Sequence, residues 1–135
     1  MSNDQGAARA LIAALMAVLR DVPGLSQVSD GVPLQAGDAA AVVEAGPETD
    51  WGFKDGDGAE MRFAVLVSCG GEAPGRARLL GEKVRRAVAT VGPELDGWRL
   101  VSVAMLRSRV LRAPGPKWTA VMEYRARMTR QGVAG

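Results

Sequence analysis

Two segments of the chain carry apolar residues at the spacing of an amphipathic helix. The first, residues 7–20, repeats Leu, Ile, Met and Val among many alanines and is followed by Pro23-Gly24. The second, residues 73–91, repeats Leu and Val and is followed by Gly92-Pro93. Because Gly and Pro end helices, we expect one helix in each segment, and each helix buries one apolar stripe.

Apolar runs between the two predicted helices indicate strands. Residues 40–45 are almost wholly apolar, and Gly46-Pro47 is expected to end this strand. From Glu60 to Cys69, apolar residues alternate with mixed ones, which predicts a second strand. The turn-like residues 28–33 leave room for one more short strand.

Two long runs complete the chain. Residues 98–111 and 117–129 are separated by Ala-Pro-Gly-Pro, a sequence that suits a hairpin connection. Both parities of the first run are fairly apolar until Arg107 and Arg109, whereas the second run alternates cleanly, with the residues from Trp118 to Met128 of one parity facing one way. The order helix, short strand, strand, strand, helix, strand, strand predicts an α+β fold, with two helices packed on one largely antiparallel mixed sheet. We expect a single domain over residues 1–135, with short flexible ends at about 1–6 and 130–135.

An acidic, glycine-rich stretch lies between the predicted strands that precede the second helix. Residues 49–63 read Thr-Asp-Trp-Gly-Phe-Lys-Asp-Gly-Asp-Gly-Ala-Glu-Met-Arg-Phe. The carboxylates reproduce only a fragment of an EF-hand loop, and Asp-Gly pairs are common in turns that bind nothing. We therefore expect a hairpin connection, in which Trp51 and Phe53 either anchor the turn or face another subunit.

The composition removes several kinds of chemistry. The chain has 135 residues, no histidine and one cysteine, Cys69. Ser-His-Asp and Cys-His catalysis and histidine or cysteine zinc sites are therefore excluded within one chain. No glycine-rich loop is followed by Lys-Ser or Lys-Thr, and no apolar run approaches the roughly 20 residues of a membrane span. We expect no catalysis, no cofactor, no metal and no membrane partner.

Charge is distributed unevenly along the chain. The net charge is +2, but residues 1–106 have a balance of −4 and residues 107–135 a balance of +6. Alternation would place Arg107 and Arg109 on one face of a sheet, near Arg125 and Arg127 of a neighbouring strand. Such a cluster is compatible with a nucleic-acid or acidic-protein surface, and equally with charges that protect a sheet edge.

The order of the motifs resembles the tail-terminator, or tail-completion, family of long-tailed bacteriophages and gene transfer agents. The resemblance covers roughly residues 8–128. It rests on Ala10-Leu-Ile-Ala-Ala-Leu15, Leu25, Val28-Ser-Asp-Gly-Val-Pro33, Asp57-Gly-Ala-Glu-Met-Arg-Phe63, Asp96-Gly-Trp, Leu106-Arg-Ser-Arg-Val and Trp118…Tyr124-Arg-Ala-Arg127. Trp118 stands where many relatives have His, a departure on which no chemistry depends.

The resemblance implies a structural protein that forms a hexameric ring. Such a ring caps the head-proximal end of the tail tube, ends tube polymerisation and joins the tail to the neck and head. Its implied partners are other copies of itself, the tail tube protein, neck or head-completion proteins, and DNA passing non-specifically through the lumen. Its implied location is the bacterial cytoplasm during assembly and then the particle. A small nucleic-acid-binding module with one basic face is the alternative function.

The resemblance also suggests roles for two groups of residues. The acidic hairpin is expected to contribute to a subunit or tube interface, because aromatic residues are enriched at interface anchors. Its candidate residues are Trp51, Phe53, Asp55 and Asp57. The arginines are expected to face an acidic partner or DNA, and the candidates are Arg107, Arg109, Arg112, Arg125 and Arg127.

Overall fold

The computed structural model describes residues 6–31, 39–54 and 56–131. These residues form two helices and one sheet of six strands. The helices are α1 (Ala7–Arg20) and α2 (Gly75–Val88). The strands are β1 (Gln27–Asp30), β2 (Ala39–Asp50), β3 (Gly56–Gly70), β4 (Glu94–Leu95), β5 (Trp98–Ala113) and β6 (Lys117–Gln131).

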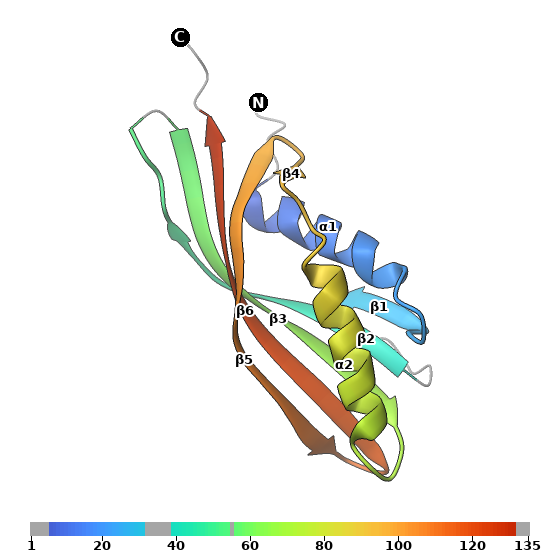
Figure 1. The fold of residues 1–135 in the computed structure, drawn as a ribbon. Helices are drawn as coiled ribbons and strands as arrows, with labels where there is room; N and C mark the ends of the chain where they lie inside the picture. The colour runs from blue at the N-terminus through green and yellow to red at the C-terminus, as the bar shows by residue number, and fades with distance from the viewer. Residues whose placement is uncertain (1–5, 32–38, 55, 132–135) are drawn as a thin grey trace.

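The sheet has the strand order β1-β2-β3-β6-β5-β4. Only β1 and β2 pair in parallel, and all other neighbours are antiparallel. The sheet is strongly twisted, and both helices lie against one of its faces (Figure 1). This arrangement confirms the α+β fold with two helices on a largely antiparallel mixed sheet. Strand β4 was not predicted, because two residues leave no periodic pattern.

The hydrophobic core lies between the helices and the sheet. Helix α1 contributes Leu11, Leu15 and Leu19, all of which are fully buried. Alternate residues of β3 and β6 face these helices, as the alternation of β6 predicted. The buried ones on these two strands are Ala59, Met61, Phe63, Val65, Val67, Cys69, Ala120, Met122, Tyr124, Ala126 and Met128.

Aromatic stacking joins the two central strands within this core. The rings of Phe63 and Tyr124, which are directly opposite in the β3–β6 ladder, stack with centroids 4.9 Å apart and an interplanar angle of 9°. Burial also raises the pKa of the Tyr124 hydroxyl. Phe63 and Tyr124 therefore connect β3 to β6 through side chains as well as through the backbone.

The predicted end at Gly46-Pro47 of the strand that includes residues 40–45 is wrong. Strand β2 continues through these residues to Asp50, with a register shift between Ala45 and Glu48. A proline fits here because β1 covers β2 only as far as Val43, so the Pro47 nitrogen needs no partner strand. Strand β3 also begins earlier than expected, at Gly56. The acidic stretch is thus mostly strand.

Strand β5 contains two register shifts. They explain why odd and even positions of residues 98–111 are both fairly apolar in the sequence. One lies between Leu100 and Ser102, and the other between Met105 and Arg107. Each extra residue moves the side chains that follow it to the other face of the sheet. The Ala-Pro-Gly-Pro hairpin before β6 is confirmed, with a positive φ of 77° at Gly115.

We expect Leu15→Ala to lower the free energy of unfolding by about 3 kcal/mol, because it leaves a cavity between α1 and the sheet. Leu79→Ala is the matched control, since Leu79 is 53% exposed on α2 and its truncation costs less than about 0.5 kcal/mol. Urea denaturation followed by circular dichroism measures both. Equal losses in the two variants would contradict the packing described.

Candidate interaction surfaces

The acidic stretch forms the closed end of the β2–β3 hairpin. Trp51 N–H donates to the carbonyl of Gly58 at 2.9 Å, and Phe53 exchanges two backbone hydrogen bonds with Gly56 at 3.1 and 3.2 Å. The expected hairpin is therefore confirmed. Its turn projects away from both helices (Figure 1), and the side chains of Trp51 and Phe53 are 37% and 43% exposed. Asp55 lies outside the described residues.

Close backbone approach accounts for the glycines of this hairpin. A Cβ at Gly58 would overlap the carbonyl of Trp51, and a Cβ at Gly56 would overlap the carbonyl of Arg130 and the ring of Phe53. Glycine is thus needed where the two arms and β6 pack together. The glycines at these two positions, which resembled part of a metal loop, are therefore a packing requirement.

Ion pairs join the hairpin to β6 on both faces of the sheet. Arg130 donates to Asp57 at 2.7 Å, and Arg127 donates to Glu60 at 2.7 Å. The Arg127 guanidinium also lies 5.3 Å from the centroid of the Trp51 ring. The hydrogen bond from Arg127 lowers the pKa of the Glu60 carboxyl, against a smaller opposing effect of desolvation. Asp57 faces the helix side of the sheet and Trp51 the opposite side, so they belong to different surfaces.

The face of the sheet opposite the helices, here called the open face, carries a mixed set of charges. Residues directly opposite in an antiparallel ladder share a face, so the register assigns each side chain. The charged members on β3, β6 and β5 are Glu60, Arg62, Lys117, Glu123, Arg125, Arg127, Arg99, Arg107 and Arg109. The expected grouping of Arg107 and Arg109 with Arg125 and Arg127 is confirmed.

Arg112 lies apart from the other candidate arginines. It is directly opposite Trp118, which faces the helix side, and its guanidinium lies 5.9 Å from the Trp118 ring centroid. Arg107 is paired with Glu123 at 3.0 Å on the open face. The five candidate arginines therefore form no single basic surface, and at least two of them are already partnered by carboxylates.

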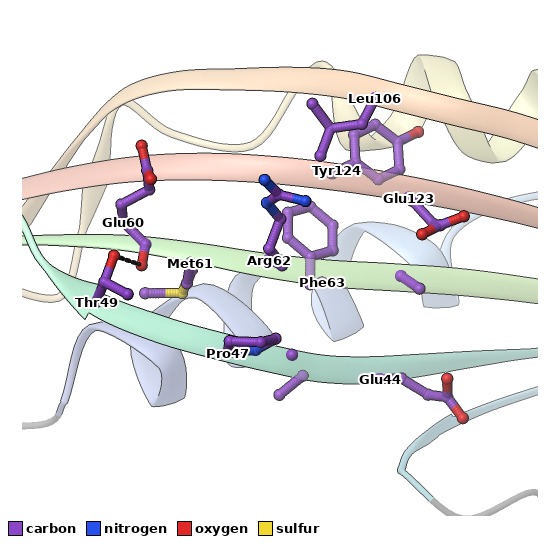
Figure 2. A pocket seen from close by; sticks show the side chains of 13 residues that line it. Glu44, Pro47, Thr49, Glu60, Met61, Arg62, Phe63, Leu106, Glu123 and Tyr124 are labelled. Carbon is purple, nitrogen blue, oxygen red and sulfur yellow. Dashed lines mark hydrogen bonds between the residues drawn. The ribbon is translucent and has the colours of Figure 1, made fainter.

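A groove of about 460 Å³ crosses the open face and contains an arginine that the sequence reading missed. Figure 2 shows Arg62 in this groove, between Glu60 and Glu123. Arg62 is directly opposite Arg125 in the β3–β6 ladder, and the buried Nε of Arg125 has no hydrogen-bond partner among the described residues. Two like charges in such a position repel each other. Only the exact strand register could have indicated this pair.

The described residues form surfaces that are suited to binding a partner through shape and charge. No group of three or more His, Cys, Asp or Glu side chains among them is arranged to hold a metal ion. Neither helix in the described part of the chain is long and apolar enough to cross a membrane. What the surface does offer is an exposed aromatic hairpin, a charged open face and two long strands, β2 and β5, which the short outermost strands β1 and β4 cover only in part.

Comparison with known families assigns the chain to the structural proteins of phage-like tails. It belongs to the family described as tail completion protein gp17, whose model matches residues 8–129. The match confirms the family that the order of motifs had indicated.

A solved structure supports the same assignment. A chain in the structure described as "Virion of native gene transfer agent (GTA) particle" is 28% identical in sequence, with a TM-score of 0.63. The alignment covers 93% of this chain and 99% of that chain. No curated protein matches the chain.

The Glu60–Arg127 pair predicts a dependence of stability on pH. A carboxyl whose pKa is lower in the folded state than in the unfolded state stabilises the fold at pH values above its ordinary pKa of 4.5. This contribution is lost as the pH falls through the pKa of the folded state. Glu60→Gln should therefore melt at a lower temperature than the wild type at pH 7. The difference should shrink as the pH falls below 4.5.

Glu94→Gln is the control for this measurement. Glu94 pairs with Arg99 at 3.5 Å, but both side chains are largely exposed, so the pair is weak. Thermal melts across the pH range should show little difference from the wild type for this variant. A Glu60→Gln difference that is constant with pH would contradict an ionic origin.

Proposed function

We propose that the protein caps the head-proximal end of a phage-like tail tube, ends its polymerisation and joins the tail to the neck and head. The observation that carries this proposal is the family match over residues 8–129. The similarity to a chain of a gene transfer agent virion over nearly the full length of both chains supports it further. The proposed locations are the bacterial cytoplasm during assembly and the finished particle afterwards.

In this proposal the protein acts as a ring of six copies around the axis of the tail. In a ring, each subunit contacts its two neighbours head to tail. Each subunit must therefore present two different surfaces that are complementary to each other. The long strands β2 and β5 are only partly covered by the short outermost strands β1 and β4, and the hairpin lies at one end of the sheet (Figure 1). The proposed partners are thus other copies, the tail tube protein and neck or head-completion proteins.

The β2–β3 hairpin is the proposed contact with the tube or with a neighbouring subunit. Trp51 and Phe53 expose large apolar surface at a position held by the Arg127 and Arg130 ion pairs. An anchored aromatic loses little conformational entropy when it binds, which favours it as an interface anchor. Asp57 belongs to this proposal through its bond to Arg130, and Asp55 through its place in the sequence.

The open face is the proposed surface for DNA in transit. Arg107 and Arg127 are paired with carboxylates, whereas Arg109 and Arg125 have no carboxylate within ion-pair distance among the described residues. A surface of alternating signs binds phosphates weakly and without sequence preference. Weak binding suits a channel through which DNA must pass, and a dedicated nucleic-acid-binding module would require a more uniformly basic face.

The capping activity is tested by polymerising the tail tube protein of the same particle with increasing amounts of this protein. We expect tubes to become shorter at ratios far below one copy per tube subunit, as electron microscopy of tube lengths would show. Unchanged tube lengths at an excess of folded protein would overturn the proposal.

Trp51→Ala combined with Phe53→Ala should weaken capping without unfolding the chain. Loss of an interface anchor costs about 2 kcal/mol or more, so the concentration needed for capping should rise roughly thirtyfold. Leu79→Ala, which removes an exposed leucine from α2, is the control. If the double variant caps as the wild type does, the hairpin is no part of the tube or subunit contact.

Arg125→Glu should impair DNA transit in assembled particles while tubes remain capped. Arg86→Glu makes the same change of charge at an exposed position of α2, on the helix side of the sheet, and is the control. The measurement is the fraction of particles that deliver DNA. If instead the isolated wild type binds DNA tightly, with a steep salt dependence, and does not cap tubes, the nucleic-acid-binding function replaces the capping function.

A further inference from the structure

Two long stretches of sheet edge lack a partner strand among the described residues. Strand β1 pairs with residues 40–43 of β2, so residues 44–50 of that strand have an open side. Strand β4 pairs with residues 98–99 of β5, so most of the remainder of β5 has an open side as well. Both stretches belong to the long strands that flank the central β3–β6 pair.

The open side of β2 presents backbone groups that are able to bind another strand. Trp51 donates to Gly58 of β3, so Trp51 and, by alternation, Thr49 direct their backbone groups towards β3. The backbone N–H and C=O groups of Glu48 and Asp50 are therefore directed away from β3, towards the open edge. Unpaired groups in a row are a template for strand addition.

The two open edges have opposite charges. Residues 44–50 contain Glu44, Glu48 and Asp50 and no basic residue. Residues 101–113 of β5 contain three arginines and no acidic residue. Pairing of β2 with β2, or of β5 with β5, would bring like charges together, whereas pairing of β2 with β5 brings opposite charges together. The charges thus disfavour a two-fold dimer and favour a head-to-tail contact.

Strand direction and side-chain facing agree with such a contact. The strands β2, β3, β6 and β5 alternate in direction, so a copy added in the same orientation places its β2 antiparallel to β5. Glu48 and Asp50 lie opposite Met61 and Ala59, on the helix side of the sheet. Arg112 also lies on the helix side, opposite Trp118. A continuous sheet therefore brings Arg112 of one copy to the face that carries Glu48 and Asp50 of the next.

We propose that the free edge of β2 pairs with the free edge of β5 of a second copy of this chain, with Arg112 beside Glu48 and Asp50. A stagger that makes these residues neighbours leaves β1 of the added copy beyond the end of β5, so the flanking short strands do not collide. The exposed Leu111 of β5, next to Arg112, is covered in this contact. The pairing of the two edges does not depend on the proposed function. Only the expectation that repeated contacts close into a ring rests on it.

Disulfide cross-linking of full-length protein tests the contact. Glu48→Cys and Arg112→Cys are made singly and together, and the native Cys69 is buried, so it does not compete. After mild oxidation, the double variant should give a ladder of covalent multimers. A mixture of the two single variants should give covalent dimers, and each single variant alone should give almost none. Cross-linking of one single variant with itself to the same extent would overturn the proposal.

Charge exchange provides a second and independent test. Glu48→Arg and Arg112→Glu should each weaken self-association by about tenfold or more in sedimentation, and the combined variant should recover most of the loss. Circular dichroism confirms folding of each variant. A wild type that stays monomeric at all concentrations, or oligomers unaffected by either change, would overturn the edge contact. Tube capping by the wild type would still be measurable, so the two proposals fail separately.

Discussion

The continuous pairing of β3 with β6 is the constraint on which the rest of the structure depends. These strands are antiparallel from Gly56 opposite Gln131 to Gly70 opposite Lys117, without a register shift. Because the register is unbroken, every residue on one parity faces the helices and every residue on the other faces outward. The core and the charged open face are therefore two consequences of one ladder, and the stacked Phe63 and Tyr124 lie near its middle.

The flanking strands β2 and β5 are less regular than the central pair, β3 and β6. Both β2 and β5 contain register shifts, which bend a strand and increase its twist. Irregularity is tolerated there because the outer side of each strand is largely unpaired. The surfaces that are suited to partners thus lie on the irregular outer strands, while the stable core belongs to the regular central pair.

Much of the fold followed from periodicity, whereas the register did not. The apolar stripe of residues 7–20 and the alternation of β6 identified α1 and the core face of the sheet, because burial on one face leaves a clear pattern. Pro47 was misread because the sequence does not show that this part of β2 has no partner strand on its outer side. Arg62 was missed because its significance comes from its position opposite Arg125, which is a long-range pairing.

The register shift after Met105 gives β5 a sensitivity to length that differs from its tolerance of substitution. Arg107 and Arg109 reach the open face only because one extra residue, Leu106, precedes them. Deleting Leu106 itself would remove the bulge and leave Arg107 opposite Glu123, whereas deleting the paired residue Ser108 would turn the rest of the strand over and carry Arg109 to the helix side. A strand of this kind accepts many replacements of its side chains and the loss of a bulged residue, yet deletion of a paired residue changes every face that follows. Single-residue deletions that keep the outward pattern are therefore confined to the two bulged positions of β5.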